Sequence, residues 1–252
     1  MSIPEFLYVF LAALAAGIIN AIAGGGTLLT FPVLTAIGIS PVVANITNTV
    51  ALCTGLLSGT YAQRKDFGAQ KMRLLKLAPI AILGGLAGGL ILLNTNENSF
   101  NKLTPYLIFT ATLLLAVQVP LKNWMVRITT KKGHRNHRFW MVILIFTAAV
   151  YGGYFGAGLG IILMAVLGLT IDDSLTSLNV LKQALSFGVN ITAAVYFAFS
   201  GQVLWLVAAV MACGAISGGF IGGRLAGKLN PDVLRWIVVL IGFTVAIIYF
   251  VK

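Results

Sequence analysis

The sequence predicts an all-α polytopic membrane protein built from two inverted-topology repeats. Hydrophobic residues make up 59% of the chain and charged residues only 9%, with a mean hydropathy of +0.97. A soluble core of this length cannot bury so much apolar surface. The apolar residues also fall into runs of membrane-helix length, and the second half of the chain repeats features of the first. We therefore expect about 8 to 10 membrane segments, including two broken or re-entrant hairpins.

The apolar runs come in a regular order along the chain. They cover residues 5–22, 27–38, 41–63, 72–93, 103–121, 139–156, 160–171, 174–199, 203–226 and 232–251. A helix needs about 20 residues to cross the hydrocarbon, so the runs at 27–38 and 160–171 are too short to span it alone. Each follows a glycine-rich break and is expected to be the short arm of a hairpin.

The charges predict the orientation. The net charge is +11, and basic residues gather at 64–76 and 122–138, with a weaker group at 224–235. The loops at 94–102 and 199–202 are nearly free of positive charge. Because Lys and Arg favour the cytoplasmic side, we expect the basic loops in the cytoplasm and the N-terminus outside, in the cell inner (plasma) membrane. This accounts for the positive charge without a nucleic-acid partner.

Self-comparison predicts the repeats. Adding 134 to a residue number pairs Ser40 with Ser174 and Asn45 with Asn179. It also pairs the glycines of GGLAGG, which begins at residue 84, with those of GGFIGG, which begins at residue 218. The predicted division is 1–121 for the first repeat, 122–138 for a basic cytoplasmic linker and 139–252 for the second repeat. The basic loop at 64–76 matches the uncharged 199–202, so the second repeat is expected to be inverted.

The two glycine breaks are candidate anion sites. The tips NAIAGGG, residues 20–26, and YFGAGLG, residues 154–160, would expose helix-terminal N–H groups, which favour anions. The alternative is that these glycines only let helices pack closely. Close packing is the expected role of GGLAGG and GGFIGG. The candidate substrate-binding residues at the tips are Asn20, Gly24, Gly25, Gly26, Thr27, Gly158 and Gly160.

The stretches 39–61 and 173–197 each carry a polar stripe on one helix face. Lys182 lies eight residues beyond Ser174, the predicted helix start, and thus roughly 12 Å down the helix, too deep to snorkel comfortably. An ionisable residue at membrane depth indicates a functional site. A structural Lys bonded to a backbone carbonyl is the alternative. The candidate substrate-binding residues on the stripes are Asn45, Asn48, Thr49, Asn179, Lys182, Gln183 and Ser186.

The positions of the acidic residues limit which ions the protein is expected to bind. All six are expected at helix ends or in loops, which leaves no buried carboxylate for a proton relay or a metal cation. Asp172 and Asp173 are predicted to cap the start of the helix that follows them. A membrane Lys, amide-rich stripes and glycine tips suit a small anion, because all of them donate hydrogen bonds. We expect neither metal nor cofactor. A membrane potential that is negative inside would favour anion export by about 2.3 kcal/mol per charge per 100 mV.

Four motifs together form a recognisable pattern: AGIINAIAGGGTLLTFPVL and ANITNT in the first half, and GGYFGAGLG and NVLKQALSFGVN in the second. This pattern resembles that of the TauE/SafE family. It covers essentially the whole chain, and the second glycine tip is the looser match. The resemblance implies export of sulfite, an organosulfonate or a related sulfur oxyanion.

The sequence thus predicts a secondary transporter that exports a small anion by alternating access, with the anion between the glycine tips and the polar faces. An anion channel is the alternative. A membrane-embedded enzyme or assembly factor is a third class; an enzyme is not expected, because general acid–base chemistry needs a partner group beside Lys182. The expected partners are the small anion and the lipid bilayer, and the sequence leaves the oligomeric state open.

Overall fold

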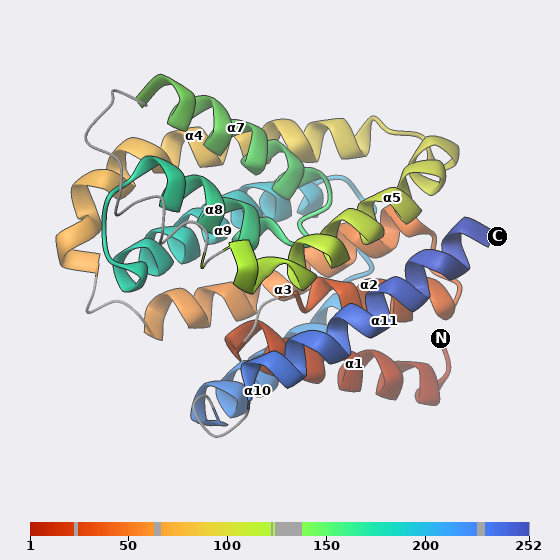
Figure 1. Ribbon diagram of the computed structural model, residues 1–252. Helices are drawn as coiled ribbons and strands as arrows, with labels where there is room; N and C mark the ends of the chain where they lie inside the picture. Colours follow the sequence, from red (N-terminus) through yellow and green to blue (C-terminus); the bar gives the residue numbers. More distant parts are fainter. Residues whose placement is uncertain (23–24, 63–66, 122, 124–137, 226–229, 252) are drawn as a thin grey trace.

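The computed structural model describes residues 1–22, 25–62, 67–121, 123, 138–225 and 230–251, and its secondary structure there is helical. Figure 1 shows the arrangement. The helices with defined bounds are α1 (Ile3–Ile22), α2 (Thr27–Ala36), α3 (Pro41–Ala62), α4 (Phe67–Leu93), α5 (Glu97–Ala116), α7 (Arg138–Tyr154), α8 (Leu159–Thr170), α9 (Leu175–Ala198), α10 (Trp205–Leu225) and α11 (Pro231–Val251). The predicted all-α class is confirmed. The predicted linker at 122–138 lies almost entirely outside the described residues.

Polar side chains set several helix starts. Asn96 caps α5 by accepting a hydrogen bond from the Ser99 N–H, and Ser174 caps α9 by accepting one from the Ser177 N–H. Such caps satisfy N–H groups that have no partner inside the helix. Ser174 is therefore the N-cap, as its place in the sequence predicts. Asp173 takes part in this helix start as well, because its Oδ1 accepts from the Ser174 N–H over 2.7 Å, while its Oδ2 accepts from Gln70 of α4.

Several helices are long and apolar enough to cross a bilayer. By length and hydropathy these are α1, α4, α9, α10 and α11, whereas α2, α7 and α8 are shorter apolar helices. Large apolar side chains such as Leu83, Leu206 and Leu240 are exposed on the outside of the bundle. A soluble protein rarely exposes contiguous apolar surface on this scale, so these side chains form the lipid-facing surface of a multi-pass membrane protein.

The folded molecule has two ends that differ in the chain segments gathered there. Figure 1 shows both termini at one end, at the right of the view, where α4 also leads into α5. We call this the terminal end. Helices α4 and α7 begin, and α10 finishes, toward the opposite end. Arg73, Arg224 and Arg235 belong to these helix ends or to the start of α11, so we call it the basic end.

The helices associate in two groups that cut across the halves of the sequence. The first bundle consists of α1, α2, α3 and α10, and the second of α7, α8, α9 and α4. Helices α5 and α11 pack mainly on each other, and α3 packs on α9 between the bundles. Each bundle therefore takes three helices from one half and its fourth helix from the other half. Replacing each helix by its counterpart in the other half converts the helix contacts of one bundle into those of the other.

Glycines let the exchanged helices approach to backbone contact. A Cβ atom at Gly84 would lie 2.8 Å from the Phe146 carbonyl oxygen of α7, and one at Gly214 would lie 2.6 Å from the Phe10 carbonyl oxygen of α1. Neither position has room for a methyl group. Small residues at such spacing are typical of close helix packing in membranes, and the packing role expected for the GGLAGG glycines is confirmed.

These contacts correct the register of the repeats. Gly84 occupies the place of Gly214, and Gly88 faces Val150 as Gly218 faces Leu14. The offset is therefore 130 residues between α4 and α10, not the 134 of the ungapped alignment. It is 136 between α1 and α7, because Leu14 takes the place of Val150. A slip of one helical turn preserves a glycine pattern with four-residue spacing, which is why the sequence alignment missed it.

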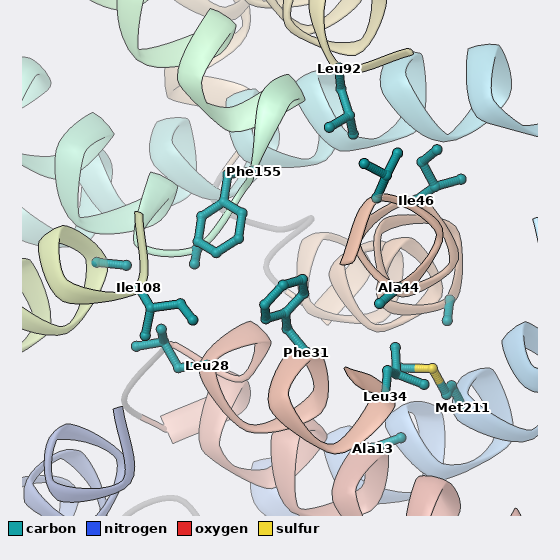
Figure 2. Close-up of a cluster of buried hydrophobic side chains, with 14 of the residues drawn as sticks. Ala13, Leu28, Phe31, Leu34, Ala44, Ile46, Leu92, Ile108, Phe155 and Met211 are labelled. Carbon is teal, nitrogen blue, oxygen red and sulfur yellow. The ribbon is translucent and has the colours of Figure 1, made fainter. Parts of the chain in front are cut away.

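The buried core lies where the hairpins of the two halves meet. Figure 2 shows Phe31 of α2 and Phe155, just after α7, pointing toward one another, with Leu28 and Ile108 beside them. Phe31 and Phe155 are each 1% exposed. Their rings meet edge to face with centroids 5.5 Å apart, a favourable aromatic geometry.

Candidate functional site

The first hairpin tip is held by a hydrogen bond to a side chain. Gly25 adopts φ = 93°, a conformation that glycine adopts readily and other residues avoid. The Gly26 N–H donates to Asn20 Oδ1 over 2.8 Å. Thr27 then begins α2, which has no side-chain N-cap of its own. Asn20 therefore fixes the tip backbone through its oxygen. Gly24, the remaining candidate here, lies outside the described residues.

The second tip uses a different support. Gly158 precedes α8 with φ = 79° and, like Gly26, leaves the helix without a side-chain cap. The Tyr151 hydroxyl of α7 donates to the Ala157 carbonyl oxygen over 2.8 Å. The two tips thus place the N-terminal ends of two short helices, α2 and α8, inside the protein. Such ends carry partial positive charge.

The polar face of the first half is buried and partly paired. Asn48 on α3 is 1% exposed, and its Oδ1 accepts a 2.6 Å hydrogen bond from the Thr30 hydroxyl of α2. This assignment directs the Asn48 amide N–H₂ away from Thr30. Thr49 donates its hydroxyl to the Asn45 carbonyl within α3, so that proton is used by the helix itself. Sequence reasoning missed Thr30, although it lies one turn beyond Gly26.

Asn45 connects the two bundles. Its Nδ2 donates over 2.7 Å to the carbonyl oxygen of Tyr154, at the end of α7. Its Oδ1 is fully buried and has no hydrogen-bond partner within the described structure. The sequence predicts Asn45 as a substrate ligand, but the structure commits its donor group to a neighbouring backbone.

The polar face of the second half carries the cation. Lys182 of α9 is partly buried, and a Cβ atom at Gly160 in the first turn of α8 would lie 3.8 Å from its Cδ. The structure therefore brings two predicted site residues into contact. Ser186, one turn beyond Lys182, is 5% exposed, and its buried hydroxyl lacks a hydrogen-bond partner in the described part of the chain. A buried polar group without a partner is uncommon and calls for an explanation.

The other predicted residues of α9 share this face less directly. Asn179 and Gln183 are partly buried on α9. Asn190, which lies on the predicted stripe but outside the candidate set, donates from Nδ2 to the Ser186 carbonyl oxygen over 2.8 Å. The hydroxyl of Ser186, in contrast, has no hydrogen-bond partner among the described residues and can receive one from a ligand.

The two polar faces are related by position. Asn48 and Lys182 differ by 134 residues, and each lies against the first two turns of the short helix of its own half, at Thr30 and Gly160 respectively. A neutral amide in one half therefore corresponds to a cation in the other. Both sit beside helix N-termini, an arrangement that can stabilise negative charge.

An acidic residue ties the start of α9 to α4 at the basic end. Asp173 accepts hydrogen bonds from Gln70 Nε2, over 2.9 Å, and from the Arg73 guanidinium, with which it forms an ion pair. These bonds, that from Gln70 first, lower the pKa of the Asp173 carboxyl from 3.8 to about 2. The carboxylate therefore stays ionised and fastens the corner between α8 and α9 to α4.

Comparison with known families places the chain in one of them. The family model described as "Sulfite exporter TauE/SafE" matches residues 9–249. The chain belongs to the TauE/SafE family. The resemblance seen in the glycine tips and the Asn-containing helix is thus confirmed. Membership in a transporter family suggests a protein that is not an enzyme.

Curated relatives in bacteria carry transporter names. A "Probable membrane transporter protein" of Haemophilus influenzae is 28% identical over 242 residues, covering 93% of this chain and 90% of the relative. "Probable membrane transporter protein ORF9" of Sinorhizobium sp is 29% identical over 247 residues, covering 95% and 90%. "Probable membrane transporter protein YfcA" of Escherichia coli K12 is 27% identical over 239 residues, covering 92% and 84%. No solved structure matches the chain significantly.

Proposed function

We propose that this TauE/SafE family member is a secondary transporter that exports a small anion, in particular sulfite, an organosulfonate or a related sulfur oxyanion, by alternating access. The proposed binding site lies between the polar faces of α3 and α9 and the N-terminal turns of α2 and α8. In this proposal the two halves are inverted repeats. The protein lies in the cell inner membrane, and its basic end faces the cytoplasm.

The observation that carries this proposal is the placement of Lys182. Its Cδ lies beside Gly160 at the start of α8, which brings the side chain that carries the ammonium group next to a helix N-terminus. The hydroxyl of Ser186, which lacks a partner within the described residues, can donate to an oxygen of the same ligand. An oxyanion offers several acceptor oxygens and would satisfy these donors together.

The facing half supports a polyatomic anion. Because Thr30 donates to Asn48 Oδ1, the Asn48 amide N–H₂ is left to donate to other groups. A site with a cation on one side and neutral donors on the other suits one compact negative charge. Among the described residues, no group of three or more His, Cys, Asp or Glu side chains could hold a metal ion.

The test is anion efflux from proteoliposomes that contain the purified protein, with sulfite, methanesulfonate and sulfate loaded inside in separate samples. Lys182→Met should abolish efflux because it keeps the length of the side chain and removes its charge. Lys102→Met is the matched control, since Lys102 is exposed on α5 and should be replaceable without effect.

The same assay separates a transporter from a channel. A transporter predicts a rate that saturates with anion concentration, whereas an anion channel predicts single-channel currents in planar bilayers. Unchanged efflux in Lys182→Met would remove this residue from the site. A failure of the wild-type protein to move any sulfur oxyanion would contradict the proposed substrate class.

A further inference from the structure

Glycine contacts identify which helices stay together. A Cβ atom at Gly153 of α7 would collide with the Gly85 carbonyl of α4, and one at Gly17 of α1 would collide with the Ala215 carbonyl of α10. Backbones in such contact cannot slide or rotate past each other without steric clash. The pairs α1–α10 and α4–α7 are therefore packed backbone to backbone, which disfavours relative motion within each pair.

The contacts between the bundles are of another kind. The first bundle meets the second along α3 and α9, and near the hairpin tips through the Phe31–Phe155 ring pair and the hydrogen bond from Asn45 to the Tyr154 carbonyl. The ring pair and the hydrogen bond are side-chain contacts that can separate without disrupting a helix. Phe100, near the start of α5, adds ring contacts to both Tyr154 and Phe155 at centroid distances of 5.7 and 6.5 Å.

This cluster lies toward the terminal end. Phe100 is in the first turn of α5, and Tyr249 is in the last turn of α11, where its hydroxyl donates over 2.6 Å to Thr35 Oγ1 of α2. Subtracting or adding 134 leads from Tyr249 to Leu115 and from Phe100 to Leu234, both aliphatic. This aromatic cluster thus has no aromatic counterpart at the matching positions 115 and 234.

The hydrogen bond from Asn45 to the Tyr154 carbonyl has a cost in free energy. A backbone carbonyl can only accept, so Nδ2 must face Tyr154 and Oδ1 must face away. That oxygen is buried and finds no donor in the described structure. A buried acceptor without a partner costs free energy, which is recovered once water reaches it. Separation of Asn45 from Tyr154 would relieve this cost.

We propose that Asn45, Phe31, Phe155 and the Tyr154 carbonyl form a gate at the terminal end, closed in this structure, between two bundles that exchange their fourth helices. The proposal rests on the proposed transport function. It makes Asn45 a gating residue and leaves substrate contact to Lys182, Ser186 and Asn48. The moving units are then α1–α2–α3–α10 and α7–α8–α9–α4, not the two halves of the sequence.

Reversible cross-linking tests the gate. In a background with Cys53→Ala and Cys213→Ala, the pair Phe31→Cys and Phe155→Cys is joined by a short bis-methanethiosulfonate. Cross-linking should abolish anion efflux, and a reducing agent should restore it. Full efflux from the cross-linked protein would overturn the gate.

The matched control joins two helices of one bundle. In the pair Gly55→Cys and Ala215→Cys, the Cβ atoms would lie 3.9 Å apart on α3 and α10, which suits a disulfide. Cross-linked control protein should keep the efflux rate of its reduced form. Loss of efflux there would show that α3 and α10 move apart during transport, and would overturn the division into bundles.

A second measurement does not depend on the substrate. In the background with Cys53→Ala and Cys213→Ala, a water-soluble maleimide should slowly label Phe155→Cys, because the gate opens. It should not label Leu163→Cys, which is buried among α4, α7, α8 and α9. Labelling at 155 without anion transport would retain the gate and reject the proposed substrate. Equal labelling rates, or protection of both positions, would reject the gate itself.

Discussion

The two hairpins of the chain have the same architecture, but the polar faces beside them differ in charge. In the first, the tip is held by a hydrogen bond to Asn20, and the polar face presents the neutral Asn48, paired with Thr30. In the second, the corresponding face presents Lys182, in contact with the first turn of α8. The difference teaches that a duplicated frame can supply two helix N-termini while the charge comes from one copy alone.

The asymmetry has a physical advantage. Two buried cations would repel each other when the site is empty, and each carries a desolvation cost. One cation facing neutral donors can attract a monovalent anion without that repulsion. On this account the first hairpin supplies rigid hydrogen-bond geometry, and the second supplies charge.

The largest expected difference is between matched glycines of the two hairpins. A methyl group at Gly26 would lie 2.7 Å from the Ala16 carbonyl oxygen and 2.8 Å from Asn20 Nδ2, whereas one at Gly160 would lie an ordinary 3.8 Å from Lys182. Gly26→Ala should therefore lower the free energy of unfolding by about 1–3 kcal/mol. Gly160→Ala should be neutral or slightly stabilising, because alanine favours the helix. Thermal unfolding in detergent measures both, and equal losses would contradict the distinction between the tips.

An intermediate loss of stability is expected from a substitution at Thr30. Thr30→Val keeps the shape of the side chain but leaves Asn48 Oδ1 buried without its donor, at a cost of about 1–2 kcal/mol. The control is Thr244→Val, because the exposed Thr244 bonds only to the Leu240 carbonyl of its own helix. Unfolding in detergent should separate the two variants. If they behave alike, the Thr30–Asn48 bond does not fix the first polar face.

The smallest effect is expected at Asp173. Its carboxyl pKa is lowered to about 2, so the bonds to Gln70 and Arg73 stabilise the fold above about pH 4 and lose that contribution as the pH falls toward 2. Because the Arg73 side chain is 43% exposed, solvent screens the ion pair, and Asp173→Asn should cost less than about 1 kcal/mol at neutral pH. The melting temperature of the wild type should approach that of the variant on acidification. A constant gap between the two would refute this coupling.

The sequence predicted much of the frame. Hydropathy and the glycine breaks gave the order of helices, and the spacing of Ser174 and Lys182 on α9 followed from helical periodicity alone. Membership in the TauE/SafE family was predicted from the same motifs. These features are local, so short stretches of sequence contain them.

Features that depend on tertiary contacts were not predicted. Nothing in the sequence indicated that the Asn45 amide bonds to the Tyr154 carbonyl 109 residues away. The pairing of Thr30 with Asn48 also joins two helices, and the sequence gives no sign that these two residues are in contact. The exchange of α4 and α10 between bundles, and the one-turn shift of their glycines, arise from helix packing that an ungapped alignment does not see.

Ligand-induced stabilisation tests the central claim most directly. A ligand that binds only the folded form at 100 times its dissociation constant adds about 2.7 kcal/mol to stability. Methanesulfonate should therefore raise the melting temperature of the wild type and of Lys102→Met, while the neutral dimethyl sulfone should not. The account predicts that Lys182→Met loses this rise. An equal rise in Lys182→Met would show that the anion binds without the cation of the second hairpin, and would contradict the account.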